Sequence, residues 1–218
     1  VKQGVRLIGG CCGTTPKHIK ATKKRLAKLK PVEVKITSKG WTEFVRQPDP
    51  RVFEPLHEKA KRERSVIVEL DTPRHLEIEE FVKGAKMLYE NGADVIMMAD
   101  NSLASPRISN IAMSAILKNE GVRALPHLTC RDRNLIGLQS HLMGLNALDL
   151  HDILVVTGDP TKIGDFPGAT SVYDVSSMEL MAKIKEMNKG ISFSGKPLRK
   201  ASNFSVAGAF NPNVRAVA

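Results

Sequence analysis

The residues best suited to chemistry follow short apolar runs, where the strands of a β/α fold would end. Glu69 follows such a run in VIVELD, and Asp159 follows another in VVTGDP. In β/α folds the active residues lie at the carboxyl ends of strands, because the loops there vary without disturbing the core. Apolar surroundings raise a carboxyl pKa and make the group a proton donor near neutral pH. Two carboxyl groups in one mouth, in different surroundings, can hold different protonation states and roles.

Each of these positions also has a simpler interpretation. Glu69 could pair with Arg74 or His75, and spacing alone favours neither reading. Asn101 and Ser102 could begin a helix, His127 could be a hydrogen-bonded structural residue, and Cys130 is better explained as a small buried hydrophobe than as a nucleophile. Gly158 is more informative, because a glycine after a strand lets a ligand approach the backbone closely.

Cys11 and Cys12 follow another apolar run, VRLI, inside a glycine-rich turn. Two adjacent thiolates can both bind Zn²⁺ if further ligands come from elsewhere. The alternative is a pair of small buried residues. Three cysteines are too few for a disulfide framework, so we expect reduced thiols in a reducing compartment.

The apolar and polar residues alternate between strand and helix patterns along most of the chain. This alternation predicts a parallel sheet with right-handed crossovers. We expect an α/β fold of the (β/α)8 TIM-barrel type, truncated to about five β/α units, with a complete five-stranded doubly wound sheet as the alternative. The expected strands are residues 5–8, 66–70, 94–98, 124–129, 152–157 and 204–210, and the expected helices are residues 16–29, 54–63, 78–91, 105–119, 134–143 and 176–187.

The composition narrows the possible partners. The chain has 218 residues, 42% of them hydrophobic and only 5% aromatic, which suits an aliphatic core covered on both faces of a parallel sheet. No stretch reaches the roughly 20 apolar residues that span a membrane. The net charge of +10 indicates a solvated lysine surface or attraction to anionic ligands. A nucleic-acid binder is disfavoured, because the basic segment 17–30 has no interleaved aromatic residues.

The segment GGCCGTTPKHI closely resembles the last zinc-binding segment of the homocysteine S-methyltransferase family. The resemblance covers about the first 30 residues. It implies that Cys11 and Cys12 are two of three cysteine ligands of a catalytic zinc, which presents the thiol of homocysteine as a thiolate. The third ligand would lie on an earlier strand that this chain does not contain.

Residues from about 65 onward resemble the methylenetetrahydrofolate reductase family, a flavin-containing barrel, in VELDTPR, ADNSLASPR, LPHLTCRDRN and VVTGDP. The resemblance implies FAD and NAD(P)H as cofactors. Glu69 would be the general acid, and Asp159 would lie near the flavin and the folate. The other implied flavin contacts are Asp100, Asn101, His127, Thr157, Gly158, Tyr173 and Asp174. The family pattern has an arginine where Thr157 stands, so one flavin contact is changed.

Together these resemblances predict an internal piece of a cytoplasmic two-activity enzyme. We expect the end of a methyltransferase domain in residues 1–30, a linker in 31–64 and the first part of a reductase domain in 65–218. The parent protein would reduce methylenetetrahydrofolate, transfer a methyl group to homocysteine and possess no nucleic-acid or membrane partner, while an oligomer is compatible with the sequence. We expect the chain alone to be inactive. The competing hypothesis is a barrel without flavin that binds folate or a partner protein.

Overall fold

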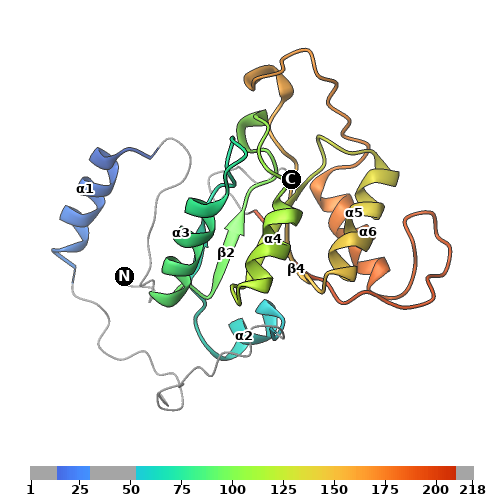
Figure 1. Cartoon of the computed structure of the whole chain (residues 1–218), viewed down its shortest axis with the longest axis horizontal. Coiled ribbons are helices and arrows are strands. Elements are labelled where there is room, and N and C mark those ends of the chain that lie inside the picture. Colours follow the sequence, from blue (N-terminus) through green and yellow to red (C-terminus); the bar gives the residue numbers. More distant parts are fainter. Residues whose placement is uncertain (1–13, 30–52, 210–218) are drawn as a thin grey trace. The chain divides into compact units, whose positions relative to one another are not determined.

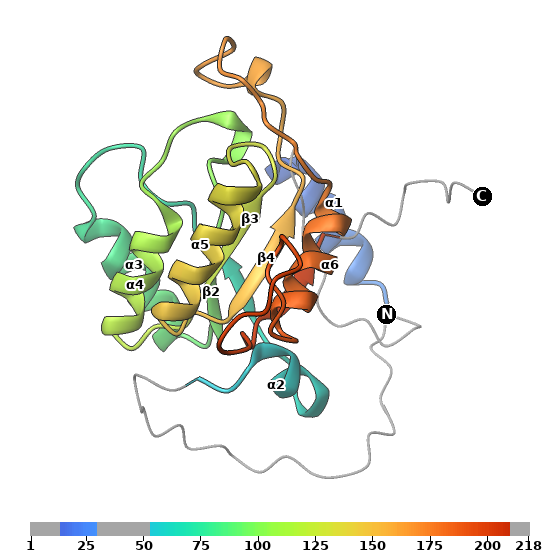
Figure 2. The same cartoon turned by 90° about the vertical axis from the view of Figure 1, so that its right-hand side faces the viewer.

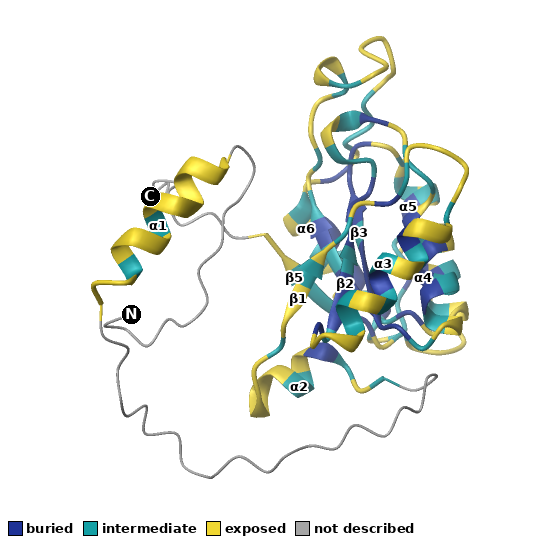
Figure 3. Ribbon diagram, turned by 60° about the vertical axis from the view of Figure 1, so that its left-hand side comes forward, coloured by how far each residue is buried: buried dark blue, intermediate teal, exposed yellow. Residues whose placement is uncertain are grey.

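The computed structural model describes residues 14–29 and 53–209, which belong to two separate units, residues 1–46 and 47–218. In the first unit, helix α1 (Pro16–Leu26) begins after the N-cap Thr15, and the Thr15 N–H donates to His18 Nδ1 at 3.1 Å. Pro16 stands at the first helical position, where its missing N–H costs nothing. None of the residues of α1 is buried, so this helix presents a solvated, basic surface (Figure 3).

The second unit is built on one parallel sheet (Figure 1). Its five described strands lie side by side in chain order, and all four pairings are parallel. A doubly wound sheet would reverse its strand order at a switch point. The sequential order therefore has the winding of a barrel. The strands are β1 (Ile67–Glu69), β2 (Val95–Met98), β3 (Ala124–Thr129), β4 (Asp152–Val156) and β5 (Ser205–Gly208).

Four helices connect these strands and pack on one face of the sheet (Figures 1 and 2). One core cluster joins Ile96 and Met98 of β2 to α3 and α4, and a second joins Ile153 and Val155 of β4 to α5 and α6. Burial of these aliphatic side chains is the main favourable term in folding. The helices are α3 (Glu79–Glu90), α4 (Asn110–Asn119), α5 (Leu135–Ala147) and α6 (Ser177–Met187), and two short 3₁₀ turns, η1 (Ser102–Ala104) and η2 (Thr161–Ile163), lie in the loops.

The opposite face of the sheet carries the other half of each strand's side chains. Glu69 is in register with Met97, and Met97 with Leu125. Because side chains alternate along a strand, these residues point to the same side, and His127, two positions after Leu125, joins them. Leu125 packs here against Leu56 and Val95 rather than against α3–α6. This face, which none of helices α3–α6 covers, brings Glu69 and His127 towards the carboxyl ends of their strands.

Helix α2 (Leu56–Arg62) covers the amino end of the sheet. The Leu56 N–H donates to Asp152 Oδ1 at 2.8 Å. The other carboxylate oxygen, Oδ2, accepts from Arg123 Nε at 2.9 Å and from Arg123 Nη2 at 2.5 Å. Both side chains are almost fully buried, so this ion pair and the helix start are held in one place.

The structure differs from the sequence-based expectations in three segments. The expected helix 105–119 begins only at Asn110, because Pro106 disfavours helical backbone at Ser105, which is extended. The helix expected to end at residue 143 continues through Gly144 to Ala147, where burial of Leu145 outweighs the glycine. Helix α2, assigned to the linker, packs on the sheet. The expected strand 5–8 lies outside the described residues.

No helix in the described ranges 14–29 and 53–209 is long and apolar enough to cross a membrane.

The buried pair between Asp152 and Arg123 gives a direct test of this packing. We expect Asp152→Ala to lower the free energy of unfolding by about 3–5 kcal/mol, because it leaves a buried guanidinium without its partner. Chemical denaturation of the intact protein measures the change. Glu120→Ala, which removes an exposed ion pair with Lys86, is the matched control and should cost less than about 1 kcal/mol. Equal effects of the two substitutions would contradict the assigned role.

Candidate functional site

Glu69 is the last residue of β1 and carries an uncommitted carboxyl group. No hydrogen bond or ion pair joins this carboxyl group to another residue of the described chain. Arg74 pairs instead with Asp165, and His75 with Glu77. Partial desolvation, and secondly the charge of Asp71, raise the pKa of Glu69 above its usual value. The expectation of a raised pKa agrees with the structure, and the alternative of pairing with Arg74 or His75 does not.

His127 and Cys130 lie on β3 and directly after it. Burial lowers the pKa of His127, although the charges of Asp100 and Asp71 oppose this shift, and its buried Nε2 has no hydrogen-bond partner within the described residues. The imidazole is therefore neutral near pH 7. Burial, and secondly the charge of Glu179, raise the pKa of Cys130 to about 11. This thiol is fully buried and protonated, which agrees with the small-hydrophobe interpretation.

Asp100 follows β2 and is buried with its carboxylate fully engaged. Oδ2 accepts from the backbone N–H and the hydroxyl of Thr129 at 3.0 and 3.1 Å, and from Arg133 Nη1 at 2.6 Å. Oδ1 accepts from Arg133 Nη2 at 3.2 Å. The side chain of Asp100 thus links the ends of β2 and β3 to each other.

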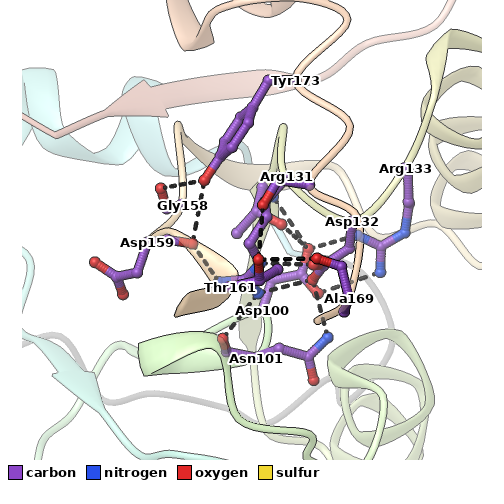
Figure 4. Close-up of polar contacts among 12 residues, drawn as sticks. Asp100, Asn101, Arg131, Asp132, Arg133, Gly158, Asp159, Thr161, Ala169 and Tyr173 are labelled. Carbon is purple, nitrogen blue, oxygen red and sulfur yellow. Dashed lines mark hydrogen bonds and ion pairs between the residues drawn. The ribbon is translucent and has the colours of Figure 1, made fainter. Parts of the chain in front are cut away.

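The loops after β2, β3 and β4 meet around the guanidinium of Arg131 (Figure 4). It donates to the carboxylate of Asp132, to the backbone oxygen of Asp159 and to that of Asn101. The Tyr173 hydroxyl lies 3.2 and 3.1 Å from the backbone oxygens of Gly158 and Asp159. Of the residues proposed from sequence, Asn101, Gly158, Asp159 and Tyr173 are therefore brought together.

Asp159 itself is exposed and only partly committed. Its Oδ2 accepts from the Leu103 N–H at 3.1 Å, whereas Oδ1 makes no hydrogen bond to a described residue. The Thr157 hydroxyl donates to Ser177 Oγ at 3.2 Å and retains its lone pairs. These oxygens can accept hydrogen bonds from a ligand at the carboxyl ends of the strands.

Gly158 and Asp174 have structural tasks that the sequence did not show. Gly158 has a φ of +90°, and a Cβ there would lie 3.2 Å from the Cβ atoms of both Thr129 and Arg131. A side chain would be strained by the positive φ and would press on both neighbours, whether or not a ligand approaches. Asp174 accepts the Leu135 N–H at 3.0 Å and so stabilises the start of α5.

Sequence reasoning missed several charged residues that organise this end of the sheet. One run of charged residues follows β3 and consists of Arg131, Asp132 and Arg133. The sequence does not show which charged side chains of such a run are buried, because that depends on their partners elsewhere in the chain. Asp71 was missed as well: it pairs with Arg107 at 2.9 Å and accepts from Ser102 Oγ at 3.2 Å. The available signal was the cluster of charges immediately after the strand ends, in ELD and CRDRN.

The arrangement offers a proton donor and hydrogen-bonding groups on one side of the strand ends. Glu69 can protonate a ligand, while Asp159 Oδ1 and the Thr157 hydroxyl can accept hydrogen bonds from a polar ring system; His127 Nε2 is buried and lacks a partner among the described residues. This set fits a heteroaromatic group such as a flavin or a pterin. No group of three or more histidine, cysteine or acidic side chains suited to a metal occurs in the described chain, and Cys11 and Cys12 lie outside it.

Comparison with protein families gives two matches. The model described as methylenetetrahydrofolate reductase matches residues 56–207, which cover the sheet, its helices and α2. The model described as homocysteine S-methyltransferase matches residues 1–26. Comparison with curated protein sequences found no match.

A buried histidine beside this site predicts a measurable pH dependence. Burial, and secondly the charge of Arg133, lower the pKa of His141 from 6.5 to about 4, and its buried Nε2 has no partner among the described residues. As the pH falls below 6.5, the unfolded chain takes up a proton that the folded state refuses until about pH 4. We expect the free energy of unfolding to fall over this window.

His141→Met should flatten that fall, because methionine does not titrate. Denaturation of the intact protein at a series of pH values measures it, with His75→Met as the control at an exposed histidine. A profile of His141→Met that is as steep as that of the unsubstituted protein would contradict the assignment.

Proposed function

The chain belongs to the methylenetetrahydrofolate reductase family, and we propose that the intact protein reduces 5,10-methylenetetrahydrofolate to 5-methyltetrahydrofolate with FAD and NAD(P)H. The family match supports folate reduction as the general activity. The observation that carries the specific proposal is Glu69, a carboxyl group with a raised pKa and no partner in the described chain, at a strand's carboxyl end.

Glu69 is suited to act as the general acid. Its raised pKa keeps a larger fraction protonated near neutral pH than an ordinary glutamate has. A proton transferred from its carboxyl group to a nitrogen of the folate's methylene bridge opens the ring and leaves an electrophilic iminium carbon. FAD, when bound and reduced by NAD(P)H, supplies the hydride that this carbon accepts.

The remaining residues would bind and orient the two ring systems. Asp159 Oδ1 is exposed and free to accept an N–H of a flavin or pterin, while its Oδ2 is fixed by Leu103. Thr157 and the backbone of Gly158 lie next to it, and His127 is neutral and unpaired at Nε2. The loops are held in place by Asp100, Asn101 and Tyr173. These three residues would therefore support the flavin largely through the loop backbone that they fix.

We propose a second activity, the transfer of a methyl group to homocysteine, from residues 1–26. Their match to the homocysteine S-methyltransferase model supports methyl transfer in general. Cys11 and Cys12 would supply two thiolates to zinc, which activates a thiol by lowering its pKa. Metal analysis of the intact protein tests this: zinc should be present and should be lost in Cys12→Ser, whereas Cys130→Ser should retain it. Zinc retained in Cys12→Ser would contradict the ligand assignment.

The competing function, a folate- or partner-binding barrel without flavin, predicts an intact protein that binds folate but contains no flavin. Cytoplasmic location, small-molecule substrates and the absence of a nucleic-acid or membrane partner are part of the same proposal, which is compatible with an oligomer.

Substitution of Glu69 separates the two halves of the reaction. We expect Glu69→Gln to lower the rate of methylenetetrahydrofolate reduction by roughly 10²–10⁴-fold, the usual contribution of a general acid. Reduction of the flavin by NAD(P)H should be nearly unchanged, because that half needs no proton from Glu69. Stopped-flow absorbance in each half-reaction measures both rates.

Stability provides the control for this substitution. A carboxyl pKa that is raised in the folded state stabilises the fold below the ordinary pKa, and this contribution is lost as the pH rises through the folded value. At neutral pH Glu69→Gln should therefore unfold at the same temperature as the unsubstituted protein or higher. Glu77→Gln, at an exposed site, should leave both half-reactions intact. Full folate reduction by Glu69→Gln would refute the role of Glu69.

A further inference from the structure

The Arg131 side chain is only 2% exposed, although the residue lies in a loop directly after β3. We propose that Arg131 is a positioning residue that holds the loops after β2, β3 and β4 in the shape the site requires, and this inference rests on the proposed function. Arg131 makes no contact with a substrate in this account; it acts through Asn101 and Asp159.

The contacts of Arg131 reach all three loops (Figure 4). Nη1 donates to the backbone oxygen of Asp159 at 3.0 Å, and Nη2 to that of Asn101 at 3.0 Å. Nε and Nη2 also bind the Asp132 carboxylate at 2.6 and 2.8 Å, which balances the buried positive charge. The backbone oxygen of Arg131 accepts the Val172 N–H at 2.8 Å. The far end of the β4–α6 loop is thereby attached as well.

The loop after β2 needs such support because its backbone is strained. Asn101, Leu103 and Ala104 have φ values of 51°, 54° and 53°, a region that non-glycine residues rarely occupy. Such a conformation persists only where its surroundings fix it. Arg131 fixes Asn101 through its backbone oxygen, and Asp132 fixes the Asn101 side-chain amide at 3.2 Å.

The strained loop in turn holds Asp159. The Leu103 N–H that binds Asp159 Oδ2 points correctly only while Leu103 keeps its left-handed backbone. Gly164, farther along the β4–α6 loop, lies so close to Ala104 that a Cβ would be 2.0 Å from the Ala104 oxygen. The two loops are therefore in close contact, and Arg131 binds a backbone oxygen in each of them, that of Asn101 and that of Asp159. A small shift there would move the free oxygen of Asp159.

Lysine cannot replace arginine in this role. The guanidinium presents five N–H groups in a rigid plane and here serves three separate acceptors. A single ammonium group on a flexible stem keeps the charge opposite Asp132 but cannot reach the Asp159 and Asn101 oxygens together. Arg131→Lys therefore keeps the positive charge next to Asp132 but removes the simultaneous hydrogen bonds that position the loops of Asn101 and Asp159.

The test compares Arg131→Lys with Arg123→Lys in the intact protein. Arg123 is a similarly buried arginine, but it pairs with Asp152 at the opposite end of the same sheet. Both variants should unfold at a lower temperature. Only Arg131→Lys should raise the folate KM or lower the amount of bound flavin, by about tenfold or more. Only in this variant should the backbone amides of Leu103, Ala104 and Tyr173 exchange hydrogen faster.

Amide exchange keeps the inference separable from the proposed function. If the unsubstituted protein holds no flavin and reduces no folate, the proposed function fails, while faster exchange confined to these loops in Arg131→Lys still supports positioning. The inference is overturned if Arg131→Lys matches Arg123→Lys in flavin content, folate KM and loop exchange.

Discussion

The in-register pairing of parallel strands is the constraint on which the rest of this structure depends. Since side chains alternate along each strand, one register decides which residues meet the helices and which reach the open face. It places Ile96 and Ile153 in the helix-facing cores and Glu69 and His127 on the other side. A shift of one residue would bury Glu69 among apolar side chains of α3 and α4. The same pairing that stabilises the sheet therefore presents the proposed acid.

The two ends of the sheet are held by different polar networks. At the amino end, Arg123 and Asp152 form a buried pair that also receives the first N–H of α2, and this closes the core. At the carboxyl end, Arg131 spreads its donors over backbone oxygens of loops whose own conformation is strained. The first network serves stability. The second fixes the conformation of the loops at the carboxyl end of the sheet. This is the end at which β/α folds carry their active residues.

Much of the fold could be predicted from the sequence, and much less of the site. The strands and most helix limits follow from apolar periodicity. The structure adds that Ser176 and Asn134 cap two of the helices, where their side chains accept the N–H groups of Glu179 and Gly137. Glu69 stands out in the sequence because it is an acid that directly follows an apolar run. Arg131 and Asp71 do not stand out, since their importance depends on partners 28–36 residues away in the chain. Local patterns do not contain such distances. The start of α4 is different, because a local rule covers it: the residue before a proline is disfavoured in helical backbone, so Pro106 excludes a helix that begins at Ser105.

The most direct test of this account is the visible absorption spectrum of the intact protein under anaerobic conditions. The account predicts a flavin spectrum that bleaches on addition of NAD(P)H and returns when methylenetetrahydrofolate is added, as the reducing equivalents pass to the folate. A folded, full-length protein without a flavin spectrum, or with a flavin that NAD(P)H reduces but the folate never reoxidises, would contradict it.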